Sequence, residues 1–148
     1  TLEIKPKTPE QYETELINNG NQISDYAKDI LYKMPPLEQS EKINIVSFTV
    51  AQLGFTENTP LSEIKARAIS LGLKLCPPQV GPDLRLSFTD QPMNSYYIIG
   101  MESISNRDDL PKLFRVGRGG GGDSLTSDRG NESSQFYPSN LFVFAVSK

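Results

Sequence analysis

The chain has 148 residues, of which 36% are hydrophobic and 22% are charged. A chain of this length can bury enough surface to fold as one unit, so we expect a single domain over residues 1–148. No stretch approaches the roughly 18 consecutive apolar residues that a membrane-spanning helix needs. These features predict a soluble globular protein.

The charged residues are mixed in sign, with 15 Lys and Arg against 18 Asp and Glu and a net charge of −3. Binding to a phosphate backbone usually needs a dense basic surface, so the composition disfavours nucleic acid as a partner. Most arginines lie after residue 78, whereas the first half carries mainly lysine. Because arginine pairs with carboxylates and phosphates through a planar fork, a binding surface is expected in the second half.

Histidine is absent, and Cys76 is the single cysteine. The chain therefore cannot build a Ser/His/Asp or Cys/His relay or a Cys/His zinc site. One cysteine also excludes an internal disulfide, which agrees with a reducing compartment. We expect a cytoplasmic location and no cofactor.

Residues 1–7 are predicted to form a loose arm or an edge strand. Thr8 before Pro9 is typical of a helix start, and Asn19-Gly20 ends that helix. A second helix is expected from residues 22–24 to Pro35, with apolar residues at helical spacing.

Residues 43–50 alternate in the manner of a β-strand. Thr59 and Pro60 then predict an N-cap and a first helical residue, and Gly72 a stop, for a helix over residues 59–71.

In the second half, the alternation of Leu84, Leu86 and Phe88 predicts a strand over residues 84–88. Further strands are expected at residues 96–102, 112–116 and 141–146, the last one central because its apolar run is unbroken. Residues 117–138 are predicted to be a mobile polar loop.

Together these elements predict an α+β fold. It has two N-terminal helices plus one further helix, packed on a mainly antiparallel β-sheet of about five strands.

Five short motifs resemble a block found in an uncharacterised family of bacterial proteins. They are Leu-Gly-Leu-Lys-Leu-Cys-Pro-Pro at 71–78, Val-Gly-Pro at 80–82, Leu-Arg-Leu at 84–86, Asp-Gln-Pro at 90–92 and Gly-Met-Glu at 100–102. The resemblance extends toward residues 23–31 and 114–118. It implies a bacterial source and one intact unit, but no reaction, ligand or partner.

The glycine-rich stretch 118–124 invites an anion-binding interpretation. It lacks the Lys-Ser/Thr of a phosphate-binding loop, so a flexible hairpin connection is the preferred interpretation. The oxygen donors Asp123, Asp128, Asn131 and Glu132 do not have calcium-loop spacing, and no metal is expected.

The preferred functional hypothesis is a non-catalytic binding module. It would bind a protein partner or a small anionic ligand through Arg85, Arg115, Arg118 and Tyr97, together with the adjacent loops. Aromatic and arginine side chains recur at binding hot spots.

Two alternatives from other classes stay open. Glu102 and Asp90 could be the acid and base of a carboxylate-only, glycosidase-like hydrolase, although Glu102 could instead pair with an arginine on a neighbouring strand. Lys65, Arg67 and Lys74 could belong to an accessory nucleic-acid-binding module.

Overall fold

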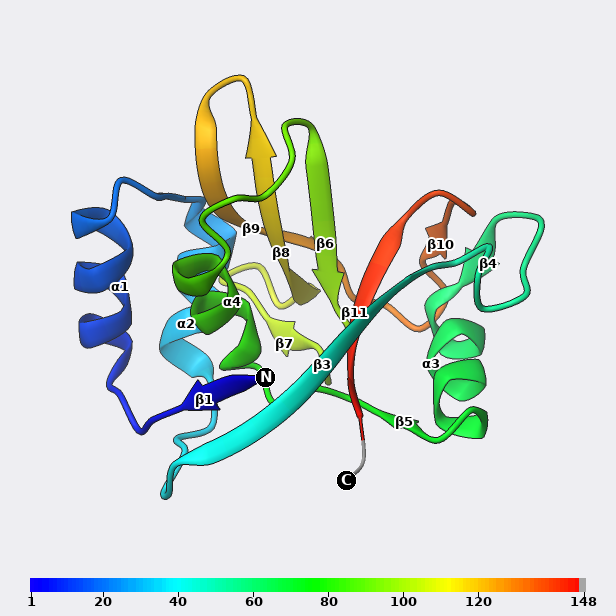
Figure 1. The fold of residues 1–148 in the computed structure, drawn as a ribbon, viewed down its shortest axis with the longest axis horizontal. Coiled ribbons are helices and arrows are strands. Elements are labelled where there is room, and N and C mark those ends of the chain that lie inside the picture. The colour runs from blue at the N-terminus through cyan, green and yellow to red at the C-terminus, as the bar shows by residue number, and fades with distance from the viewer. Residues whose placement is uncertain (147–148) are drawn as a thin grey trace.

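The computed structural model describes residues 1–146 and shows four helices and a large mixed sheet. Nine strands form this sheet, which curls into a half-barrel (Figure 1). The α+β class is right, but the predicted mainly antiparallel sheet of about five strands with three helices is wrong. The sheet is larger because several segments predicted as loops pair with it.

The helices are α1 (Pro9–Asn18), α2 (Asp25–Lys33), α3 (Leu61–Ser70) and α4 (Val80–Ser87). Along the sheet the strands follow the order β1 (Leu2–Ile4), β3 (Glu41–Thr49), β11 (Leu141–Val146), β6 (Ser95–Ile99), β8 (Pro111–Gly119), β9 (Gly122–Arg129) and β2 (Gln22–Ile23). Beside this path, β5 (Leu73–Lys74) pairs with β11 and β7 (Ile104–Ser105) with β8. A separate two-stranded sheet joins β4 (Thr59–Pro60) and β10 (Gln135–Phe136).

The sheet is mixed because β11 runs antiparallel to β3 but parallel to β6, and β2 runs parallel to β9. The predicted central position of residues 141–146 is confirmed, since β11 has neighbours on both sides. Residues 1–7 contain the short edge strand β1, which pairs with the start of β3.

The two N-terminal helices are confirmed. Thr8 caps α1 and forms a capping box with Gln11, and Ser24 accepts a hydrogen bond from the Ala27 amide at the start of α2. The third helix, α3, starts at Leu61 with Pro60 as its N-cap, one residue later than predicted. Thr59 and Pro60 pair with β10, so Thr59 is not the N-cap.

The predicted strand at residues 84–88 is wrong, because residues 80–87 form α4. Pro82 lies in the first turn of this helix, where an amide hydrogen has no intrahelical acceptor and its loss is tolerated. Val80 and Leu84, four residues apart, share the buried face. The apolar alternation that suggested a strand arises because α4 is buried on several sides.

Residues 117–138, predicted to be a loop, contain β9 and β10. The glycine-rich stretch forms the hairpin between β8 and β9, with Gly119 opposite Gly122, as the preferred interpretation expected. Gly117 has a second role: a Cβ there would lie 2.6 Å from the Tyr96 ring, so only glycine lets that ring lie against β8.

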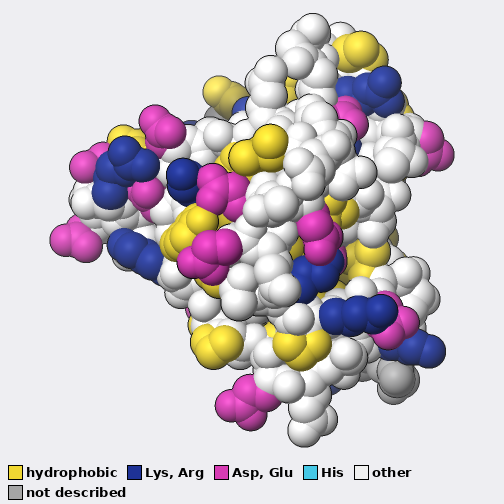
Figure 2. Space-filling view, turned by 90° about the vertical axis from the view of Figure 1, so that its left-hand side faces the viewer, with side chains coloured by type: hydrophobic (Ala, Val, Ile, Leu, Met, Phe, Trp, Pro, Cys, Tyr) yellow, Lys and Arg dark blue, Asp and Glu magenta, His cyan; other side chains and the backbone are white. Residues whose placement is uncertain are grey.

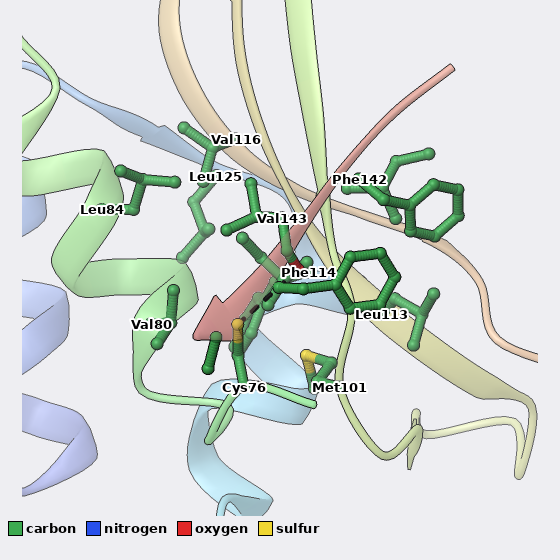
Figure 3. Packing of buried hydrophobic residues seen from close by; sticks show 14 of the residues in the cluster. Cys76, Val80, Leu84, Met101, Leu113, Phe114, Val116, Leu125, Phe142 and Val143 are labelled. Carbon is green, nitrogen blue, oxygen red and sulfur yellow. Dashed lines mark hydrogen bonds between the residues drawn. The ribbon is translucent and has the colours of Figure 1, made fainter. Parts of the chain in front are cut away.

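Part of the core lies between the sheet and α4. Figure 3 shows Val80 and Leu84 of α4 directed toward Val143, Val116 and Leu125 of the sheet. Cys76 is buried: its thiol donates a weak hydrogen bond to the Val143 carbonyl at 3.6 Å, and burial raises its pKa to about 12. No helix within residues 1–146 combines the length and apolarity needed to cross a bilayer.

Candidate functional site

The sheet has an unpaired stretch of backbone along β3. β1 covers only residues 41–43 of that strand, with Leu2 opposite Ile43 (Figure 1). Beyond this point, no strand in the described part of the chain pairs with β3 on the side away from β11. This leaves part of an edge with free hydrogen-bonding groups.

The register shows which groups are free. The Val50 amide donates to the Asn140 carbonyl at 3.0 Å, in line with the ladder that places Thr49 opposite Leu141. In an antiparallel ladder the bonded pairs alternate. The even-numbered residues of β3 therefore bond to β11, and the odd-numbered ones direct their N–H and C=O groups outward.

Local hydrogen bonds satisfy the outward amide and carbonyl of Thr49, the last of these residues. The Thr49 amide donates to Gln52 Oε1 at 2.8 Å, and the Thr49 carbonyl accepts from the Leu53 amide at 3.2 Å. Ile45 and Ser47 have no such partners among residues 1–146. The open edge of β3, defined here as residues 45–47, thus presents two amides and two carbonyls.

An apolar groove borders this open edge. Its volume is about 290 Å³, and it lies between β3 and α4. Its lining residues come from β3, α4, β6 and β11 and from the residue that follows α4: Ile45, Val46, Ser47, Leu84, Ser87, Phe88, Tyr97 and Val143. A free strand edge beside an apolar groove is the arrangement that peptide-binding domains use for strand addition.

Close packing holds the α4 wall of the groove against the sheet. A Cβ at Gly81 would lie 2.6 Å from the buried Phe114 ring, so the helix backbone approaches β8 closely. At the other end of α4, the rings of Phe88 and Tyr97 meet edge to face with centroids 5.5 Å apart. These contacts give the groove an aromatic end formed by two well-placed rings.

A buried arginine fastens the loop between α4 and β6. Arg85 is 1% exposed, and its Nη1 donates to Gln91 Oε1 and to the Gly117 carbonyl, each at 2.7 Å. Its Nη2 donates to the Phe88 carbonyl at 2.7 Å and lies 3.5 Å from Asp123 Oδ2. Burial lowers the pKa of Arg85 and the Asp123 carboxylate opposes that shift.

Arg118 completes this polar cluster from β8. It donates to the Gln91 carbonyl at 2.9 Å, and its Nε lies 3.5 Å from Asp123 Oδ1. Gln91, itself 1% exposed, donates to the carbonyls of Ser95 and Val116. The cluster fixes the position of Phe88 at the groove, because Arg85 holds the Phe88 carbonyl directly.

The four residues predicted for a binding surface thus separate into three places. Arg85 and Arg118 meet at the buried cluster, and Tyr97 lines the groove. Tyr97 lies opposite Val116 in the ladder and Arg115 opposite Ile98, so Tyr97 and Arg115 project from opposite faces of the sheet. Arg115 instead lies over the Tyr96 ring, 4.9 Å from its centroid.

The two carboxylates predicted for a hydrolase flank β6 in the chain: Asp90 precedes the strand and Glu102 follows it. Neither carboxylate lines the groove. The arrangement brings no acid and base together there.

The basic residues predicted for nucleic-acid binding also differ in their contacts. Lys65 is 7% exposed and pairs with Glu132 at 3.2 Å, and Arg67 donates to the Leu53 carbonyl at 2.9 Å. Lys74 is exposed on β5. Figure 2, which shows the side of the molecule at the left of Figure 1, has basic and acidic side chains interspersed.

Another buried polar pair, not expected from the sequence, joins α1 to α4. The Tyr12 hydroxyl donates to Asp83 Oδ2 at 2.7 Å. Burial raises the pKa of Asp83, and the hydrogen bond from Tyr12 opposes this shift. Burial and the nearby Asp83 also raise the pKa of Tyr12. The pair fixes the position of α4, and hence of the groove wall, relative to α1.

Among residues 1–146, no group of three or more acidic or cysteine side chains is placed to hold a metal ion. The cluster at Asp123, Asp128 and Glu132 is divided between ion pairs to Arg85, Arg115 and Lys65.

Comparison with known proteins gives no match to a family model, a curated protein or a solved structure.

Proposed function

We propose that this protein is a binding module that adds an extended segment of a partner protein to its sheet at the open edge of β3. The observation that carries the proposal is the position of the Ile45 and Ser47 backbone groups, which have no hydrogen-bond partner among residues 1–146, directly beside the apolar groove. Main-chain hydrogen bonds would hold the segment, and the groove would take its side chains.

The expected free energies of contact are those of a modest, reversible interaction. Each net hydrogen bond contributes about 0.5–1.5 kcal/mol, and burying one large apolar side chain contributes about 1.5–3 kcal/mol. The conformational entropy that the peptide loses on binding offsets part of this favourable free energy. We expect a dissociation constant in the range of about 1 μM to 1 mM for a short peptide.

A partner segment suits the open edge better than a second copy of this protein does. A second β3, nine residues long, would extend past Ile45 to the level of Ile43, where Leu2 already pairs. Thr1, bonded to Asn44 through its hydroxyl, occupies the intervening level. At the other end, Gln52 holds the Thr49 amide. The space therefore accepts about three extended residues.

A small anion bound by the predicted arginines receives less support. The Arg85 guanidinium is buried and is already surrounded by the side-chain oxygens of Gln91 and Asp123 and by two backbone carbonyls. An arginine engaged in this way holds the protein together and has little capacity left for a ligand.

The test uses a phage-displayed library of random nine-residue peptides, selected against the full chain and measured by titration calorimetry. Ser47→Pro removes the outward amide hydrogen and breaks no bond to β11, since the Ser47 amide points away from that strand, and proline is tolerated at strand edges. Ser47→Ala is the matched control. We expect selected peptides to bind the alanine variant as they bind the native chain, and to lose at least about tenfold in affinity on the proline variant.

Slowed hydrogen exchange of the Ile45 and Ser47 amides on peptide addition would support the site directly. The proposal fails if the library yields no binder. It also fails if the selected peptides bind a folded Ser47→Pro variant as tightly as the Ser47→Ala variant.

A further inference from the structure

We infer that the contact between Tyr12 of α1 and Asp83 of α4 is a proton-sensitive fastening, which holds the two helices together more firmly in mildly acidic solution than at neutral pH. This fastening concerns the attachment of α1 and is independent of the proposed strand addition.

The two side chains meet where α1 packs against α4. Tyr12 is fully buried, Asp83 is 8% exposed, and the Tyr12 hydroxyl donates to Asp83 Oδ2 at 2.7 Å. A carboxylate that leaves water is costly unless an opposite charge and hydrogen bonds replace its hydration. The ionised form of Asp83 therefore depends on what its surroundings supply.

Those surroundings supply little positive charge. Among residues 1–146, no lysine or arginine forms an ion pair with Asp83. Lys7 attracts the carboxylate from a distance, but its Nζ is bonded to Glu15 Oε2 at 2.9 Å, and Glu15 itself repels the charge of Asp83. Tyr12 is thus the main group that favours the ionised form.

The other elements packed on α4 add no cation next to Asp83. β8 and β9 present the apolar Val116 and Leu125 to this helix (Figure 3). Arg118 of β8 and Asp123 of β9 lie around Arg85 instead. The balance at Asp83 is therefore set by burial, Tyr12, Lys7 and Glu15.

The sign of the pH dependence follows from this balance. Burial raises the pKa of Asp83, and the Tyr12 hydrogen bond and the Lys7 charge oppose the shift only in part. A group of this kind stabilises the docked state fully below the ordinary pKa of aspartate, about 3.9. That contribution is lost as the pH rises through the higher value of the docked state.

A second contact of α1 has the opposite pH dependence. Glu13 accepts a hydrogen bond from Tyr32 and pairs with Lys28, and these contacts with α2 lower its pKa. They weaken as the pH falls and Glu13 gains a proton. The contribution of Asp83 is therefore measured as a difference between two proteins in which Glu13 is unchanged.

Asp83→Asn provides that difference. Asparagine has nearly the size of the neutral acid and can accept the same hydrogen bond, but it does not ionise. Hydrogen exchange of the α1 amides gives the constant for local opening of the helix in each protein. We expect the ratio of native to variant opening constants to rise by at least about threefold between about pH 4 and pH 7.

Asp108→Asn is the matched control. Asp108 accepts a hydrogen bond of the same length, 2.7 Å, from the Tyr26 hydroxyl, but that pair lies at the surface. An exposed carboxylate keeps its hydration whether or not a helix opens. We expect the ratio of native to control opening constants to change by less than about 1.5-fold over the same range.

Titration of the Asp83 carboxyl carbon, followed by NMR, tests the fastening without relying on a folded Asp83→Asn variant. We expect a higher midpoint in the native protein than in the urea-unfolded chain. Tyr12→Phe keeps the buried ring but removes the donor, so we expect a still higher midpoint in that variant.

Three results would overturn the inference. The first is a native midpoint at or below that of the unfolded chain. The second is a Tyr12→Phe midpoint no higher than the native one. The third is a ratio of native to Asp83→Asn opening constants that stays constant or falls as the pH rises.

Discussion

Arg85 shows how a single residue can support the groove without touching what the groove binds. Its side chain is enclosed, and it links the end of α4 to the loop before β6 and to the backbone of β8. From the sequence, its charge and its place in an apparent strand suggested an exposed binding group. The helical conformation of residues 80–87 directs it inward.

Replacement of Arg85 by methionine should be strongly destabilising. It leaves the Gln91 side chain and the Phe88 and Gly117 carbonyls without their donor in a buried place, and each buried group left without a partner costs about 1–3 kcal/mol. Urea unfolding followed by circular dichroism measures the change. Arg107→Met is the control, since Arg107 pairs with Asp29 at the surface.

We expect the control variant to unfold at nearly the native midpoint. An Arg85→Met protein as stable as the Arg107→Met protein would show that the buried contacts contribute little. It would also remove the role assigned here to Arg85 in holding Phe88 at the groove.

At the scale of elements, α4 decides the shape of the site. It forms one wall of the groove and lies close enough to β8 that a Cβ at Gly81 would meet three atoms of the Phe114 side chain within 2.8 Å. Phe114 is fully buried and cannot move aside freely. The absence of a side chain at residue 81 is thus a requirement of packing.

Gly81→Ala is therefore expected to destabilise the protein by about 1–3 kcal/mol, the usual cost of an overpacked core. Helix propensity alone predicts the opposite, because alanine favours a helix over glycine by about 1 kcal/mol. Thermal unfolding of the two proteins distinguishes these expectations.

Gly120→Ala serves as the matched control, because a Cβ at Gly120 meets no atom within 4 Å. We expect that variant to unfold close to the native temperature. If Gly81→Ala raised the unfolding temperature, the close approach of α4 to β8 would be contradicted.

At the scale of the whole molecule, the sheet ends in short strands. β1 has three residues and β2 has two, and short edge strands are one way in which proteins limit edge-to-edge association. Between β1 and the turn after β3, the open edge leaves room for about three residues.

We therefore expect the protein to sediment as a monomer up to about 100 μM, since a second β3 cannot fit the open edge without displacing β1. Analytical ultracentrifugation of the native chain and of Ser47→Pro measures this. A dimer formed by the native chain but not by the proline variant would contradict the expected monomer. It would place a second copy of the protein at the open edge.

The sequence by itself determined the features that depend on local chemistry. The capped start of α1, the presence of α2, the strand at residues 43–50 and the apolar strand at the C-terminal end were predictable. So was the hairpin at the glycine-rich stretch. Each of these depends on neighbouring residues, whose backbone preferences and side-chain spacing are visible in the chain.

Only the tertiary structure decided the helical state of residues 80–87, the mixed sheet and the open edge. Burial on several sides gives α4 an apolar pattern that spacing cannot distinguish from a strand. Which edge of β3 stays unpaired depends on residues more than 40 positions away, namely Leu2 and Leu141. Of the predicted site residues, Tyr97 alone lines the groove, because pairing between distant strands sets the face on which each side chain lies.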